Sequence, residues 1–233
     1  MNAAPCDLSV TKNVLSLIVV SLLLLLVFTS TAKAYKKGNK APRGIASFME
    51  PLVLFVRDDI AIPNIGEDKY EKYLPYLLTA FFFIWFSNLL GLIPIFPGGA
   101  NLTGNIAVTM VLAVFTLLIT NFNANKHYWK HIFATPGVPK PILLIMIPVE
   151  FIGIFTKPFA LMVRLFANIT AGHIIILSLV SLVFIFETIA IAPVSIAFGL
   201  FMNVLELLVA ALQAYIFTLL SALFISGAVA EEH

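Results

Sequence analysis

Two long apolar segments near the C-terminus decide the fold of this chain. The first, Pro141 to Phe186, reads PILLIMIPVEFIGIFTKPFALMVRLFANITAGHIIILSLVSLVFIF, and the second, Ala192 to Val229, reads APVSIAFGLFMNVLELLVAALQAYIFTLLSALFISGAV. A helix rises 1.5 Å per residue, so forty helical residues reach ~60 Å, about twice the ~30 Å thickness of the hydrocarbon layer. Each segment is therefore either two spans or one strongly tilted helix. Neither has a polar turn near its middle, which favours two long tilted helices joined over Glu187 to Pro193.

The composition of the whole chain agrees with a membrane location. Hydrophobic residues make up 61% of the chain and charged residues 11%, whereas a soluble domain usually has roughly a quarter charged residues. The net charge of +2 indicates no nucleic-acid partner. Cys6 is the single cysteine, which excludes an internal disulfide and a cysteine metal cluster. We therefore expect an all-α integral membrane protein without cofactor or metal.

Three shorter apolar runs precede the two long segments, so about five helices are expected to cross the membrane. The expected spans are residues 14–32, 74–93, 105–120, 141–186 and 192–229, within a single membrane domain over residues 14–233 that follows an extracytoplasmic segment over residues 1–13. The first run could instead be a signal peptide, because Ala32-Lys33-Ala34 resembles a cleavage site. Its length approaches the ~20 residues of a span, and only Lys12 precedes it, which favours a retained helix.

Two clusters of basic residues indicate the orientation. They follow the first span (Lys33, Lys36, Lys37, Lys40, Arg43) and the third (Lys126, His127, Lys130, His131, Lys140). The positive-inside rule places both clusters in the cytoplasm, with the N-terminus outside and the C-terminus cytoplasmic. His127 and His131 could hold a metal, but no third ligand is nearby, so a solvated or headgroup-facing helix turn is the preferred interpretation.

The segment between the first two spans is too polar to cross the bilayer. Gly44 to Ile60 mixes apolar residues with Glu50, Arg57 and Asp59, which predicts an amphipathic helix on the cytoplasmic surface. Ile62 to Glu71 is expected to be a polar loop, with Pro63 and Gly66 as helix breakers.

Ionisable and amide side chains interrupt the two long segments. A charge at mid-bilayer costs ~2.5–3.5 kcal/mol, so such groups line water, pair with each other or face a partner. The first segment has Glu150, Lys157 and Arg164 spaced by seven on one face, with Asn168 one turn further and then His173; the second has Asn203, Glu206 and Gln213 on one stripe.

The chemistry of these groups separates their expected roles. Arg164 cannot lose its proton in a protein, so it is a fixed positive charge that can attract and displace a moving carboxylate. His173 lies nine residues later and points to the opposite side of the helix. His173 and Glu206 can both take up and release protons, which makes a proton relay between adjacent membrane helices reasonable.

Structural interpretations of the same residues stay open at this point. Arg164 could be a buried cation paired with Glu206 or Glu150, and Lys157 could extend its ammonium group to the membrane surface. The amides of Asn168, Asn203 and Gln213 could join helices by hydrogen bonds. Ion translocation, solute transport and a purely structural anchor are all compatible with the residues, although the halves of the chain lack the repeats usual in secondary transporters.

Two motifs carry a resemblance to a known family. KPFALMVRLFANITAGH (Lys157 to His173) and LELLVAALQAYIF (Leu205 to Phe217) resemble, in order, the two signatures of subunit a of F-type ATP synthases. Glu150 occupies a family acidic position, and Glu231-Glu232-His233 is similar to a common family ending. Many bacterial members carry glutamate at the position of His173 and histidine at that of Glu206, so the two residue types are exchanged here.

The resemblance implies a stator subunit that has no catalytic activity alone. It would lie in a bacterial inner membrane beside a ring of c subunits, with peripheral-stalk b subunits and the rest of the ATP synthase as partners. Arg164 would face the ring between two offset half-channels. The remaining candidates for the proton pathway are Asn168, His173, Asn203, Glu206 and Gln213, with Glu150 near the cytoplasmic exit. A sodium-translocating version is the alternative within the family.

Overall fold

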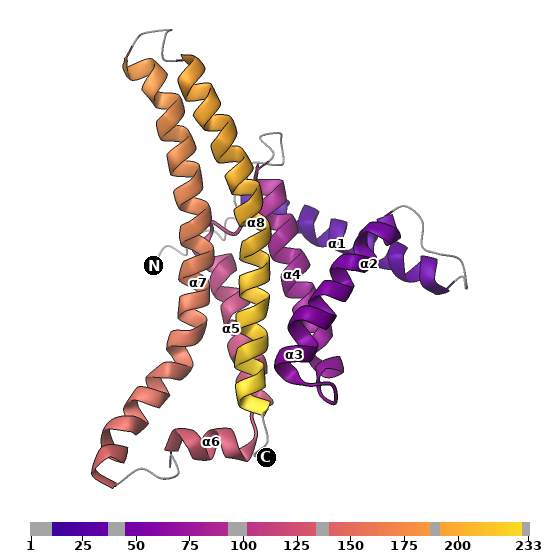
Figure 1. The fold of residues 1–233 in the computed structure, drawn as a ribbon, viewed down its shortest axis with the longest axis vertical. Coiled ribbons are helices and arrows are strands. Elements are labelled where there is room, and N and C mark those ends of the chain that lie inside the picture. Colours follow the sequence, from indigo (N-terminus) through magenta and orange to yellow (C-terminus); the bar gives the residue numbers. More distant parts are fainter. Residues whose placement is uncertain (1–10, 37–44, 93–101, 134–139, 187–191, 230–233) are drawn as a thin grey trace, which may run out of the picture.

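The computed structural model describes residues 11–36, 45–92, 102–133, 140–186 and 192–229, and all its regular secondary structure over these ranges is helical (Figure 1). The long elements are α1 (Lys12–Lys36), α4 (Tyr70–Leu92), α5 (Ile106–Phe122), α7 (Lys140–Ile185) and α8 (Ala192–Val229). The short elements are α2 (Ile45–Phe55), the π-helix η1 (Val56–Ala61), α3 (Ile62–Ile65) and α6 (Lys126–Phe133). The expected all-α class is confirmed.

Four of these helices, α1, α4, α7 and α8, are long and apolar enough to cross a membrane, and α5 is a shorter apolar helix. The interpretation of each long C-terminal segment as one continuous helix is confirmed, because α7 has 46 residues and α8 has 38. Pro148 and Pro158 lie inside α7, and Figure 1 shows α7 bending away from α8 toward its N-terminal end. Proline removes a helical hydrogen bond and bends a helix without necessarily ending it.

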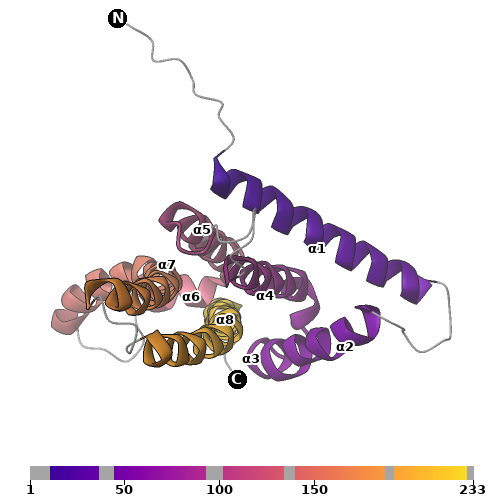
Figure 2. The same cartoon turned by 90° about the horizontal axis from the view of Figure 1, so that it is seen from above.

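Helix α4 forms the centre of the bundle. Seen from above, α1 and α7 lie on opposite sides, with α4 and α8 between them (Figure 2). Phe82 of α4 is fully buried, and its ring centroid lies 5.1 Å from that of Phe28 of α1. Phe217 of α8 belongs to the same buried cluster. Burying an aromatic side chain of this size removes ~150–250 Å² of its surface from solvent, which stabilises the packing of α8 against α4. Helix α7 packs on the other side of α8.

The segment after α2 differs from its prediction. We expected a loop from Ile62, but the helical path continues through η1 and α3 to Ile65. Pro63 lies in the first turn of α3, directly after the π-helix η1, and the helical path continues through it, so it does not act as a breaker. Gly66 does end the helix, with a φ of 95° that side-chain-bearing residues rarely adopt.

The C-terminal end of α8 is held by groups from other elements. Asn125 donates its backbone N–H to the carbonyl of Ala228 at 2.9 Å and its side-chain amide to that of Val229 at 2.8 Å. Lys69 donates to the Val229 carbonyl at 3.3 Å. These donors satisfy carbonyls that lack partners within the helix. They fix the end of α8 against the start of α4 and the α5–α6 turn.

Candidate functional site

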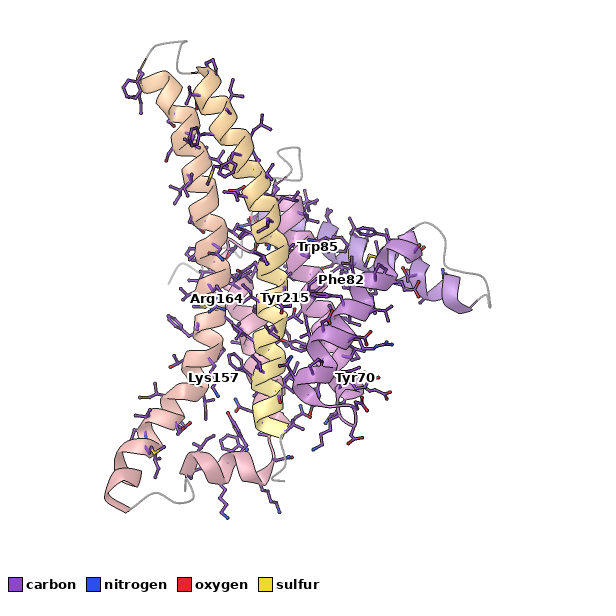
Figure 3. All side chains as sticks on the ribbon, viewed as in Figure 1. Tyr70, Phe82, Trp85, Lys157, Arg164 and Tyr215 are labelled. Atoms are coloured by element: carbon purple, nitrogen blue, oxygen red, sulfur yellow. The ribbon has the colours of Figure 1, made fainter. Side chains whose placement is uncertain are left out.

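Arg164 lies midway along α7 and is exposed on the surface of the isolated chain (Figure 3). Leu161 and Leu165, on either side of it in sequence, are buried at 1% and 0% exposure, so α7 packs through these residues and leaves Arg164 on its open side. Among the described residues the salt bridge found is Arg57–Asp58. The alternative in which Arg164 pairs with Glu206 or Glu150 is therefore wrong for this structure.

One turn beyond Arg164, a hydrogen bond between amide side chains joins the two long helices. Asn168 of α7 donates from Nδ2 to Oε1 of Gln213 on α8 at 2.8 Å. Gln213 is 1% exposed, so its carbonyl depends on this donor. The sequence analysis named both residues as candidates for the proton pathway. It also named them as groups that could join helices by hydrogen bonds. The structure brings them together directly.

This bond leads to a prediction about stability. Replacing Asn168 with alanine is expected to lower the free energy of unfolding by about 1–2 kcal/mol, because the buried Gln213 carbonyl loses its donor. Thermal melting of the detergent-solubilised complex measures the change. Asn203→Ala is the matched control, since Asn203 bonds the carbonyl of Gly199 in its own helix. An equal loss in both variants would show that the Asn168–Gln213 bond contributes nothing specific.

Glu206 of α8 lies against the backbone of Gly172 on α7. A Cβ atom added at Gly172 would overlap Oε1 of Glu206 and would lie 3.1 Å from its Cδ atom. The missing side chain at position 172 therefore makes the room that the carboxylate occupies between the helices. Oε1 of Glu206 is buried. His173 follows Gly172 in the chain, and its side chain lies outside the described residues.

A small cavity extends this polar region to α4. It has a volume of about 20 Å³ and is lined by residues that include Asn88, Asn168 and Glu206. A cavity of ~10–15 Å³ holds one water molecule where polar partners surround it, so this cavity has room for water. Asn88 is 3% exposed. Its side chain accepts a hydrogen bond from Thr103 Oγ1 at 2.5 Å and donates to the carbonyl of Ala210 at 3.3 Å.

Asn88 and Thr103 were not among the residues predicted from the sequence. Asn88 is the single amide side chain of α4, a mostly aromatic and aliphatic helix, and Thr103 lies in the short segment before α5. The sequence did contain one indication: an amide side chain within a membrane helix is costly to bury unless it has a hydrogen-bond partner. That signal alone does not say which helix supplies the partner.

Three other predicted residues lie apart from this cluster. Asn203 is exposed and bonds its own helix, so its suggested role in joining helices is wrong. Glu150 lies at the N-terminal part of α7, where burial and then the Glu150 charge raise the pKa of Tyr128 on α6. Lys157 places Nζ 5.7 Å from the centroid of the Phe224 ring on α8.

Comparison with known proteins gives a consistent result. A family model described as "ATP synthase A chain" matches residues 14–226. "ATP synthase subunit a" of Chloroherpeton thalassium is 53% identical over 97% of this chain and 68% of the relative. "ATP synthase subunit a 2" of Chlorobaculum tepidum is 50% identical over 99% of this chain and 66% of the relative. The chain thus spans about two thirds of the length of these relatives.

Proposed function

Because the chain belongs to the ATP synthase A chain family of multi-pass membrane subunits, we propose that it is the proton-conducting stator subunit of the complex. In this role it protonates and deprotonates carboxylates on a rotating ring of c subunits and so couples proton flow to rotation. The observation that carries the proposal is the polar cluster between α7 and α8. Glu206 lies there against Gly172, beside the Asn168–Gln213 bond and a water-sized cavity.

The first step of the proposed pathway is proton uptake at Glu206. Its carboxylate lines the cavity together with Asn88 and Asn168, and a water molecule there would carry a proton between the polar groups. Neutral amides can donate and accept hydrogen bonds without changing charge. They therefore orient water and the carboxyl group while Glu206, with His173 as the second titratable group of the pathway, exchanges the proton.

The second step takes place at the open face of α7. Arg164 is exposed there, and a c-subunit carboxylate passing this face would meet a cation that keeps its proton at all working pH values. The cation favours the ionised form of the carboxylate, which therefore releases its proton before it passes. The same charge repels protons that would cross directly between the two half-channels. Arg164 thus separates proton entry from proton exit.

The remaining assignments follow from the charge pattern and the family. The basic segments after α1 and α5 would face the cytoplasm of a bacterial cell, with the N-terminus outside. Glu150, in the N-terminal part of α7 and close enough for its charge to act on Tyr128, would then lie near the cytoplasmic exit. Peripheral-stalk b subunits would hold this subunit fixed relative to the ring. ATP itself would be made in the catalytic head of the complex.

The ion is tested by ATP-driven acidification of inverted membrane vesicles that contain the assembled complex. We expect acidification in sodium-depleted buffer, monitored by quenching of a pH-sensitive dye, and its collapse on addition of a protonophore. Vesicles without ATP are the control. Acidification that needs added sodium would identify a sodium-translocating complex, and its absence under both conditions would contradict the proposed ion conduction.

A further inference from the structure

A second small cavity lies where α5, α6, α7 and α8 meet, and it shares no described lining residue with the cavity beside Glu206. Its volume is about 10 Å³, and its walls include Thr120 and Asn121 of α5, Tyr128 of α6 and Pro158 of α7. One water molecule requires ~10–15 Å³ and two to four polar partners. The cavity therefore has room for a single water molecule, and the polar groups in its walls decide whether one binds.

Two oxygen atoms of residues that line this cavity are buried and have no hydrogen-bond partner among the described residues, Oγ1 of Thr120 and Oδ1 of Asn121. Thr120 is 7% exposed. The other buried threonines of α5, Thr109 and Thr116, donate to carbonyls three or four residues earlier, at 3.0 and 3.2 Å. Thr120 makes no such bond. Because a buried polar group without a partner is costly, both oxygens indicate an occupant that can form hydrogen bonds.

A proline in α7 contributes a third oxygen to this cavity. Pro158 has no backbone N–H, so the carbonyl of Ile154, four residues earlier in the same helix, lacks its usual helical donor. Both residues are buried and both line the cavity. In membrane helices, ordered water is one of the groups that satisfy a carbonyl freed by proline. The carbonyl of Ile154 thus adds a backbone acceptor to the two side-chain oxygens.

Lys157 supplies a strong donor and limits what the occupant can be. Among the described residues that line the cavity, Lys157 alone is exposed. Its Nζ lies 5.7 Å from the centroid of the Phe224 ring, which lines the same cavity. An ammonium group has three donors and no acceptor, and its charge repels a metal cation. The oxygens of the walls disfavour an anion. A small neutral molecule that both donates and accepts satisfies all of these groups.

We propose that the cavity binds one water molecule, which joins α5 to α7 at the proline bend. The water accepts hydrogen bonds from the Lys157 ammonium group and the Thr120 hydroxyl, and it donates to Asn121 Oδ1 and to the carbonyl of Ile154. These bonds use both hydrogens and both lone pairs of the water. The site is separate from the Glu206 cavity, so it can be present whether or not the chain conducts protons.

The direct test is a high-resolution electron cryo-microscopy map of the intact ATP synthase complex in nanodiscs. We expect density for one water molecule within ~2.7–3.2 Å of Thr120 Oγ1, Asn121 Oδ1 and Lys157 Nζ. Lys157→Met keeps a long side chain but removes the donor, so the same density should be weaker in this variant. A map without the water would overturn the proposal, whether the Thr120 hydroxyl turns to the carbonyl of Thr116 or the Lys157 ammonium group binds both oxygens directly.

Hydrogen exchange of the intact complex tests the water through its effect on the two helices. Thr120→Val keeps the shape of the side chain and removes the hydroxyl. We expect amides in the peptides of α5 and α7 that border the cavity to exchange about fivefold faster, because the water loses a partner.

Thr109→Val is the matched control for this measurement. Thr109 is fully buried in the same helix but bonds a carbonyl of that helix, so its replacement should leave exchange in these peptides unchanged. Without a bound water, Thr120→Val would remove a hydroxyl that has no partner. Exchange that is slower or unchanged in Thr120→Val would therefore overturn the proposal, as would equal acceleration in both variants.

Discussion

Replacing Arg164 with alanine is expected to reduce ATP-driven acidification of inverted vesicles to background while the complex still assembles. Arg164 lies exposed on α7 and forms no salt bridge with a described carboxylate, so its charge would be available to the c-subunit carboxylate of the proposed mechanism. Leaving a desolvated carboxylate without its cation costs roughly 3–5 kcal/mol. If the whole cost falls on the rate-limiting step, that step becomes roughly a hundredfold to several thousandfold slower. The rate of dye quenching per assembled complex measures the loss.

The control for this experiment is the same substitution at another exposed arginine. Arg57 pairs with the adjacent Asp58 at 2.7 Å on η1, away from α7. Arg57→Ala should therefore keep most of the wild-type acidification. Undiminished acidification by an assembled Arg164→Ala complex would reduce Arg164 to a structural residue and would contradict the proposed coupling. Subunit composition after purification shows whether each variant assembles.

Replacing Gly172 with alanine is expected to lower the acidification rate about tenfold to a hundredfold. The new Cβ atom would occupy the place of Glu206 Oε1, so the carboxylate must leave its position beside the cavity. A displacement of about 1 Å at a reacting group can cost a hundredfold in rate. The side chain can move, so the helix should still fold. The acidification rate per assembled complex is the measurement.

Two variants distinguish this effect from general damage to α7. Gly153 lies in the same helix, and nothing lies within 4 Å of a Cβ atom added there, so Gly153→Ala should keep the wild-type rate. Glu206→Asp shortens the side chain by one methylene and should partly restore the rate of Gly172→Ala. A normal rate in Gly172→Ala alone would show that the position of the Glu206 carboxylate does not limit proton transfer.

The polar cluster shows how far spacing along one helix predicts a site. The sequence indicated that Glu206 and Gln213 share a stripe on α8 with Asn203, and Gln213 is indeed buried against α7, where it accepts from Asn168. Asn203 is on the same stripe yet exposed. Helical periodicity gives the direction of a side chain about its own axis. It does not show at which positions along the axis a neighbouring helix packs against that face and buries its side chains.

The contribution of α4 could not be predicted for a related reason. Asn88 of α4 and Glu206 of α8 line the same cavity although they are far apart in the chain. The hydrogen bonds of Asn88 run to Thr103 and to the carbonyl of Ala210. No local pattern links these positions. The pathway roles of all the candidate residues stay predictions from the sequence and the family.

The sequence by itself determined the fold class and the long continuous helices, because helix formation and membrane burial depend on local runs of apolar residues. It also singled out Arg164 and Glu206 as candidates for the proton pathway, because a charged residue within an apolar helix is costly and can be recognised from the sequence. Only the tertiary structure decided which groups meet: Glu206 with Gly172, and Asn168 with Gln213. Those contacts depend on how helices pack and diverge, which is set by side chains distributed over several helices at once.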